Sequence, residues 1–130
     1  MEYIFLLGRI LLGGFFIRSG YNHFANLAMF TGYAQSKGVP MAKASVAITG
    51  LILLLGGVGI LLGFQVQCAV ILLSVFLIGT TFKMHAYWSI SDPMSRMVES
   101  VNFYKNLALL GAVLTLLAIP LPWVMSLMLW

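Results

Sequence analysis

The side chains that could do chemistry in this sequence are few, and most of them stand at the ends of long apolar stretches. Histidine, lysine and asparagine can donate hydrogen bonds to the carbonyl oxygens of a ligand head. A molecule with a polar head and an apolar tail, such as a quinone or a lipid, suits such a place. Ordinary anchoring at the depth of the lipid headgroups is the alternative explanation. The candidate ligand-binding residues are Arg18, His23, Lys83, His85, Lys105 and Asn106.

Metal binding, nucleophilic catalysis and ion pumping are poorly supported. The chain has two histidines, His23 and His85, and one cysteine, Cys68, so neither a cysteine metal site nor an internal disulfide is expected. No nucleophile–base pair or phosphate-binding loop stands out, and a self-contained enzyme is therefore not expected. Ion pumps usually need an acid inside the membrane, but the three acidic residues lie outside the expected spans: Glu2, Asp92 and Glu99.

Two arginines lie within or at the edge of the first apolar stretch. Arg9 and Arg18 are nine positions apart, which turns an α-helix by about 180°, so the two side chains point to opposite faces. A straight helix cannot bring both into one pocket. A charge inside a span is by default a functional candidate, but for this pair we favour snorkelling to the membrane surface or a structural hydrogen bond.

The elements that must position these side chains are membrane-spanning helices. The chain has 130 residues, 62% hydrophobic and 8% charged, whereas soluble domains carry about 25% charged residues. A helix needs about 20 mostly apolar residues to cross the hydrocarbon core. We therefore predict an all-α, polytopic membrane protein, a bundle of four transmembrane helices in a single domain covering residues 1–130. The expected spans are residues 3–24, 44–64, 66–82 and about 103–125.

The connections between these spans differ in length. The second and third spans contain no charged residue between them, and Gly63–Gln67 is the only polar break. A tight helical hairpin is expected there. A short helix in the membrane interface is expected near Ala25–Ser36, and Gly38 and Pro40 then break it before the second span.

The loop before the fourth span holds most of the late charges. Asp92 and Pro93 fit the N-cap and the first position of a helix, which could run on into the fourth span. Pro120 and Pro122 are expected to bend that span near its end. We interpret the charged residues of this loop as facing water: Asp92, Arg96 and Glu99. The aromatic residues expected around the polar mouth are Phe24, Tyr87, Trp88, Phe103 and Tyr104.

Basic residues and glycines give two further predictions. Lysine and arginine gather at the side of the two long loops, with only Arg9 near the other side, so the positive-inside rule places the long loops in the cytoplasm and the termini outside. Gly59 and Gly63 form a G-x-x-x-G pair, which lets helix backbones approach closely. We assign both to helix packing, favouring contacts within one chain and leaving a homo-oligomer open.

Several motifs together resemble the DoxX family, in order and spacing along about residues 5–118. They are "GRILLGGFFIRSGYNHF", "KGVP", "LLLGGVGILLGF", His85 at the end of the third span, and "FYKNLALLGAVLTLLA". The matching positions are Arg9, Gly20, Gly38, Pro40, His85, Lys105, Asn106 and Gly111. Two departures stand out: relatives often carry a glutamate in the second span, where this chain has only Ser45 and Thr49, and this chain ends "LPWVMSLMLW" without their Gly-Pro-Gly stretch.

The resemblance implies a small four-helix protein of the bacterial cytoplasmic (inner) membrane. The namesakes of the family resemble subunits of a thiosulfate:quinone oxidoreductase, which implies an accessory, quinone- or lipid-interacting subunit of a membrane redox system without a redox centre of its own. The implied partners are membrane lipid and a redox protein or larger membrane complex. No covalently bound cofactor is expected, and no basic-aromatic pattern indicates nucleic acid. A purely structural or assembly subunit of a larger membrane complex is the alternative.

Overall fold

The computed structural model describes residues 1–127 of the chain, and within them it contains helices and no strand. Four helical stretches, built on α1, α3, α4 and α5, are long and apolar enough to cross a membrane. The predicted all-α fold with four membrane-spanning helices is confirmed. The elements are α1 (Glu2–Ala25), α2 (Leu27–Ser36), α3 (Ala42–Leu62), α4 (Val66–Met84), α5 (Pro93–Thr115) and the short 3₁₀ helices η1 (Tyr87–Ser89) and η2 (Leu116–Ala118).

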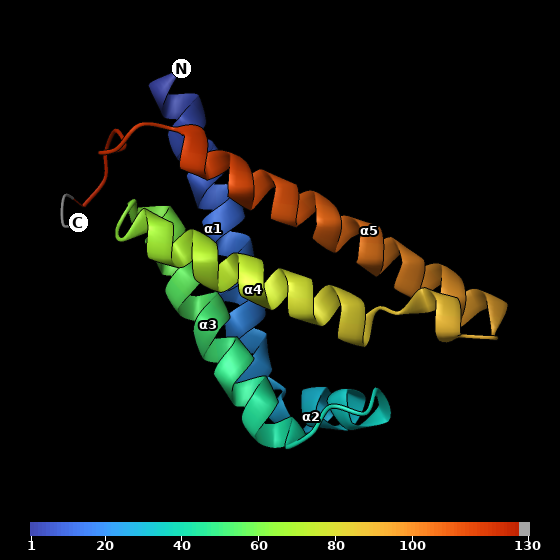
Figure 1. The fold of residues 1–130 in the computed structure, drawn as a ribbon. Coiled ribbons are helices and arrows are strands. Elements are labelled where there is room, and N and C mark those ends of the chain that lie inside the picture. Colours follow the sequence, from blue (N-terminus) through green and yellow to red (C-terminus); the bar gives the residue numbers. More distant parts are fainter. Residues whose placement is uncertain (128–130) are drawn as a thin grey trace.

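The four long helices form two pairs that diverge (Figure 1). α1 packs along α3, α3 packs on α4, and α4 packs on α5. The pairs meet near the α3–α4 turn and separate toward the end that holds α2 and the start of α5. This end carries the connections at residues 26–41 and 85–92, and it is called the long-loop end below.

Glycine allows α1 and α3 to make backbone contact. A Cβ atom on Gly13 would lie 2.8 Å from the carbonyl oxygen of Gly57, and a Cβ atom on Gly20 would lie 2.7 Å from that of Gly50. No side chain fits at such distances. Because lipid tails are as apolar as leucine, close packing of this kind, and not the exclusion of water, holds membrane helices together.

The Gly59 and Gly63 pair lies at the tight turn between α3 and α4. A Cβ atom on Gly59 would be 2.7 Å from the side chain of Ala69 in α4, so this glycine lets the two helices cross closely. Gly63 has a φ of 66° and Gln65 a φ of 47°, and this left-handed backbone reverses the chain between the helices. The predicted hairpin is confirmed, and these contacts are made within one chain.

The apolar core lies where the long helices meet. All four contribute side chains that are almost completely buried, so α5 is packed against α4 and not loosely attached. The main members are Phe16, Leu53, Ile60, Leu73, Leu77 and Val113.

Local sequence signals account for α2 and for the start of α5. α2 is the short helix expected before the second span, and Gly38, with a φ of 75°, follows it. The side chain of Asp92 accepts a hydrogen bond from the backbone N–H of Ser95 at 2.9 Å, and Pro93 is the first helical residue. That hydrogen bond lowers the pKa of the exposed Asp92 carboxyl below its usual value. The predicted helix start is confirmed.

The fourth span differs from its predicted bounds of about 103–125. α5 begins at Pro93, and the helical stretch ends at Ala118. Pro120 and Pro122 lack the N–H groups that a helix needs, so the chain leaves the helix instead of bending within it. The segment that follows returns to the α3–α4 turn (Figure 1).

Arg9 holds this returning segment against α1 and α3. The residue is 2% exposed, and its guanidinium lies 5.7 Å from the ring of Phe5 and 5.5 Å from that of Trp123. The carbonyl groups of the last turn of a helix lack hydrogen-bond partners within the helix. Arg9 donates hydrogen bonds to two of these groups at the end of α3. Snorkelling of Arg9 is therefore wrong, and structural hydrogen bonding is confirmed. The guanidinium donates to the carbonyl oxygens of Ile60, Leu61, Val124 and Met125.

Candidate ligand-binding cavity

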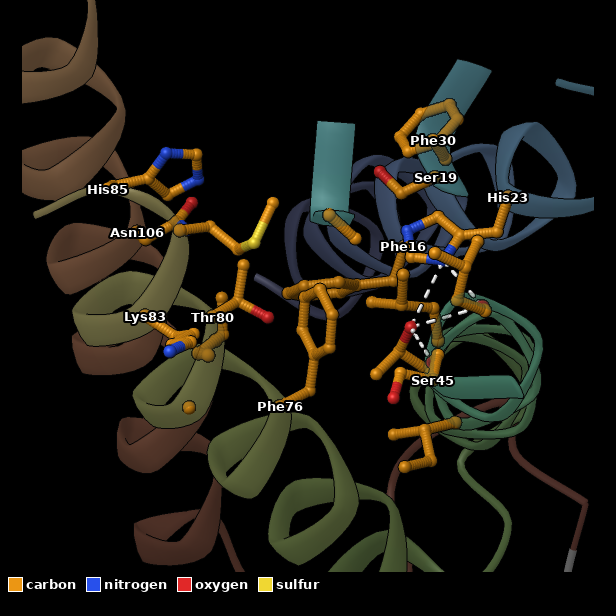
Figure 2. A pocket seen from close by; sticks show the side chains of 18 of the residues that line it. Phe16, Ser19, His23, Phe30, Ser45, Phe76, Thr80, Lys83, His85 and Asn106 are labelled. Atoms are coloured by element: carbon orange, nitrogen blue, oxygen red, sulfur yellow. Dashed lines mark hydrogen bonds between the residues drawn. The ribbon is translucent and has the colours of Figure 1, made fainter. Parts of the chain in front are cut away.

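A cavity of about 450 Å³ lies among the helices toward the long-loop end (Figure 2). All five α-helices contribute to its wall. Its apolar lining includes Phe16, Leu53, Phe76 and Leu77, while polar groups stand on two facing walls, one formed by α4 and α5 and the other by α1 and α3. Its volume falls in the range of about 300–1,000 Å³ that is typical of small-molecule sites.

Five of the six predicted ligand-binding residues line this cavity: His23, Lys83, His85, Lys105 and Asn106. The sixth, Arg18, is exposed and takes no part in the wall. Five positions separate Arg18 from His23, which places the two side chains about 140° apart around α1. The structure therefore brings His23 to the residues of α4 and α5, and leaves Arg18 outside.

Glu99 of α5 is buried beside the cavity, with 9% of its surface exposed. Its Oε2 accepts a hydrogen bond from Nδ1 of His85 at 2.6 Å, and its Oε1 accepts one from the hydroxyl of Tyr33 at 2.7 Å. The interpretation of Glu99 as water-facing is therefore wrong. Asp92 and Arg96, from the same loop and helix start, are exposed as expected.

The spacing of residues along α5 carries the signal for this burial. Glu99, Phe103 and Asn106 stand at positions i, i+4 and i+7, and all three are buried. Such spacing marks one face of a helix. Because α5 begins at Pro93, Glu99 belongs to this buried face. The charged residues around Glu99 in the sequence indicate a water-facing position instead.

The cluster of Tyr33, Glu99 and His85 fixes which atoms donate and which accept. A carboxylate only accepts, so the hydrogen on Nδ1 of His85 is committed to Glu99, and Nε2 is the ring nitrogen that remains for a ligand. Partial burial raises the pKa of the Tyr33 hydroxyl above its usual value, and the hydrogen bond to Glu99 and the charge of Glu99 raise it further. Tyr33 therefore stays protonated and keeps donating at neutral pH.

On the facing wall, His23 reaches from α1 into the cavity (Figure 2). Its Nδ1 lies 2.9 Å from the carbonyl oxygen of Val46 and 3.2 Å from the hydroxyl oxygen of Thr49. Because a carbonyl only accepts, Nδ1 carries the hydrogen. The ring packs beside Phe30 at 4.9 Å and Phe76 at 6.3 Å between centroids. His23 is thus held in one orientation, and no group of residues 1–127 bonds its Nε2.

Three donors on the wall of α4 and α5 have no partner within the part of the chain that the structure describes. Asn106 is 7% exposed, yet its amide bonds to no residue there. Lys83 and Lys105 line the cavity without an acidic partner, since the one ion pair among residues 1–127 joins His85 to Glu99. Buried amides normally have hydrogen-bond partners, so Asn106 marks a place for a ligand group or a water.

The polar groups of the cavity form a hydrogen-bonding set. His23 and His85 stand on opposite walls (Figure 2), and the Nδ1 of each is already bonded to Val46 or Glu99. Among residues 1–127, no three histidine, cysteine, aspartate or glutamate side chains are placed to hold a metal ion.

The aromatic residues expected at the mouth of the site form a separate cluster. Tyr87 lies 5.4 Å from both Trp88 and Phe103, and Phe103 lies 5.3 Å from Tyr104, between ring centroids. None of these four lines the cavity, and Phe24 does not line it either, so that expectation is wrong. η1 and α5 pack the four rings against each other instead. The aromatic side chains of the cavity wall are Phe15, Phe16, Phe30, Tyr33 and Phe76.

A protein-family model described as DoxX matches residues 4–86, which is more than half of the chain. The matched part runs from α1 to the end of α4 and includes His23, Lys83 and His85, but it stops before α5. The resemblance at residues 103–118 therefore lies outside the match. No curated protein and no solved structure matches the chain.

Proposed function

Because this chain belongs to the DoxX family and is a multi-pass membrane protein with four membrane-spanning helices, we propose that it is an accessory subunit of a membrane redox system that binds a quinone or a lipid. The cavity among the helices carries this proposal. It has a volume of about 450 Å³, two polar walls and a largely apolar lining. A molecule with a polar head and an apolar tail fits such a site.

The two polar walls account for the head of the ligand. The ammonium of Lys83 and the amide of Asn106 can donate hydrogen bonds to a carbonyl or phosphate oxygen, and His85 presents its Nε2 beside them. The apolar tail would pack against Phe16 and Phe76, which lie between the walls (Figure 2).

The route into the cavity supports a ligand that comes from the bilayer. Phe15 of α1 and Val75 of α4 both belong to the cavity wall, and they are 40% and 62% exposed. Gly79, one turn beyond Val75, is exposed as well. These residues lie within membrane-spanning helices, so a lipid-soluble molecule can reach the cavity directly from the hydrocarbon region.

In this proposal the chain supplies binding, and a partner protein supplies the redox centre. The side chains of the cavity donate and accept hydrogen bonds and do not themselves carry electrons. The Glu99, His85 and Tyr33 cluster would hold the start of α5 against α2 beside the bound head.

We further propose that the protein lies in the bacterial cytoplasmic membrane with its long-loop end in the cytoplasm. The excess of lysine and arginine at that end supports this orientation. Arg9, the basic residue near the opposite end, is bound to carbonyl groups inside the protein. It is therefore not included when the basic residues at the two membrane surfaces are compared. The residues of the excess are Arg18, Lys37, Lys43, Lys83, Arg96 and Lys105.

Mass spectrometry of the protein purified from its native membrane, followed by titration with decylubiquinol, tests the proposal. The hydroxyl groups of this probe can donate to Nε2 of His85, and its oxygens can accept from Lys105. We expect a lipid-soluble molecule to accompany the protein, and we expect His85→Ala and Lys105→Ala each to weaken binding about fivefold or more. Arg18→Ala is the control and should bind as the wild type does. Unchanged binding in both cavity variants would contradict the proposed site. A stoichiometric protein partner without a small molecule would instead support a structural subunit.

A further inference from the structure

The α1–α3 wall of the cavity presents acceptors whose own hydrogens are already committed. The Nδ1–H of His23 is directed at the carbonyl oxygen of Val46, at 2.9 Å. The hydroxyl of Thr49 donates to the carbonyl oxygen of Ser45 at 2.8 Å, and the hydroxyl of Ser45 donates to that of Pro40 at 3.0 Å. His23, Thr49 and Ser45 therefore offer lone pairs to the cavity, beside the hydroxyl of Ser19 and the amide of Asn22, which can also donate.

The Nε2 atom of His23 is the most constrained of these acceptors. A flip of the ring would break the bond to Val46, and the rings of Phe30 and Phe76 limit other movements. Ser19 and Asn22 lie on the same wall, but neither bonds Nε2. An acceptor left without a hydrogen in apolar surroundings is unfavourable, so the site is suited to a ligand that brings one.

We propose that the head of the ligand carries a hydroxyl group, as a phenol or a hydroquinone does, and that this hydroxyl donates to Nε2 of His23. This inference rests on the proposed function and adds the hydrogen-bonding class of the head. A carbonyl oxygen placed next to Nε2 could not form a hydrogen bond with it, because both atoms are acceptors. On the opposite wall Lys83 and Asn106 offer hydrogens, beside the Nε2 of His85.

A head with two oxygens in para positions would use both walls. One hydroxyl donates to His23, and the other oxygen accepts from the donors of α4 and α5. The reduced, hydroxyl-bearing form of such a ring is therefore bound more tightly than the oxidised form, which has only acceptors.

Isothermal titration calorimetry with para-hexylphenol and its methyl ether, para-hexylanisole, tests this inference, since the two probes differ in the ability to donate one hydrogen bond. The titrations use the purified protein in detergent at about pH 8, where an imidazole is neutral. We expect the wild type to prefer the phenol about fivefold or more over the ether after correction for partitioning into micelles. His23→Phe should lose that preference while keeping its affinity for the ether.

Two further variants separate the acceptor from the fold. His23→Gln keeps an acceptor on the side chain and should restore part of the preference, whereas Arg18→Ala, which lies outside the cavity on the same helix, should leave it unchanged. Equal affinity for both probes in the wild type, or an undiminished preference in His23→Phe, would overturn the inference while the cavity proposal stands. Absence of binding by both probes would overturn the cavity proposal and this inference together.

Discussion

The hydroxyl of Tyr33 on α2 donates a hydrogen bond of 2.7 Å to Glu99 on α5, although the two residues are 66 positions apart in the sequence. The other oxygen of the same carboxylate is bonded to His85. One acid thus joins the short helix before the second span, the end of α4 and the first turns of α5. These three elements form the long-loop end of the cavity.

Removal of the Glu99 carboxylate should loosen this end of the molecule. Glu99→Ala leaves Tyr33 and His85 without their partner, and we expect it to lower the free energy of unfolding by about 1–3 kcal/mol. Thermal unfolding in detergent measures the change. Glu2→Ala removes an exposed acid and serves as the control, with an expected change within about 0.5 kcal/mol. Equal melting temperatures for Glu99→Ala and wild type would contradict the structural role of the cluster.

The hydrogen bond to Glu99 also predicts how Tyr33 titrates. The pKa of Tyr33 in the folded protein lies above its usual value of 10.0. The stabilisation that comes from the protonated hydroxyl is therefore fully present below about pH 10 and is lost as the pH rises toward the folded pKa. The ultraviolet absorbance of tyrosinate, compared between wild type and Tyr33→Phe, should show the missing transition above pH 10. If the transition that Tyr33→Phe loses is centred at pH 10.0 or below, the prediction is contradicted.

Arg9 should be one of the most sensitive positions for stability. Arg9→Met leaves the carbonyls of Leu61 and Val124 without their donor, and we expect a loss of at least about 3 kcal/mol in the free energy of unfolding. Arg9→Lys keeps the positive charge but lacks the planar guanidinium group with its several N–H donors, so it should retain only part of the stability lost in Arg9→Met. Arg18→Met, at an exposed position on the same helix, is the matched control. A similar stability of the Arg9 and Arg18 variants would contradict the role assigned to Arg9.

The orientation can be measured with two introduced cysteines in a Cys68→Ser background. Gln67→Cys lies at the start of α4 near the tight turn, and Ser91→Cys lies in the long-loop connection; both positions are exposed. A maleimide that cannot cross membranes should label Gln67→Cys in cells with the cytoplasmic membrane intact. It should label Ser91→Cys only after the membrane is opened. The reverse pattern would show that the long loops lie outside.

The elements of the fold follow largely from local patterns in the sequence. Uninterrupted apolar stretches predict the membrane-spanning helices, Gly63 and its polar neighbours predict the tight turn, and Asp92 with Pro93 predicts the start of α5. Each of these signals involves residues that are close together in the chain, and short-range physics decides their structure.

The contacts that depend on residues far apart were beyond such patterns. The carbonyl that Arg9 binds at Val124 is 115 positions away, and nothing near Arg9 indicates it. The charged neighbours of Glu99 indicate a water-facing position, although its spacing to Phe103 and Asn106 marks a buried face. Five of the six candidate ligand-binding residues line one cavity, but only the geometry shows which of their atoms are left to donate and which to accept.

The central claim is that the cavity is a binding site for an amphipathic molecule, and two glycines allow it to be tested without disturbing the core. A Cβ atom on Gly79 or on Gly111 would meet nothing within 4 Å, but only Gly79 belongs to the cavity wall. Both lie in membrane-spanning helices, so Gly79→Trp and Gly111→Trp add the same side chain within the membrane, one at the cavity and one away from it.

The most direct measurement is the affinity of these two variants for decylubiquinone in lipid nanodiscs. Gly79→Trp should bind at least about tenfold more weakly than the wild type, because the indole occupies the space of the ligand. Gly111→Trp should bind as the wild type does. Equal affinities of Gly79→Trp and Gly111→Trp would contradict binding in this cavity.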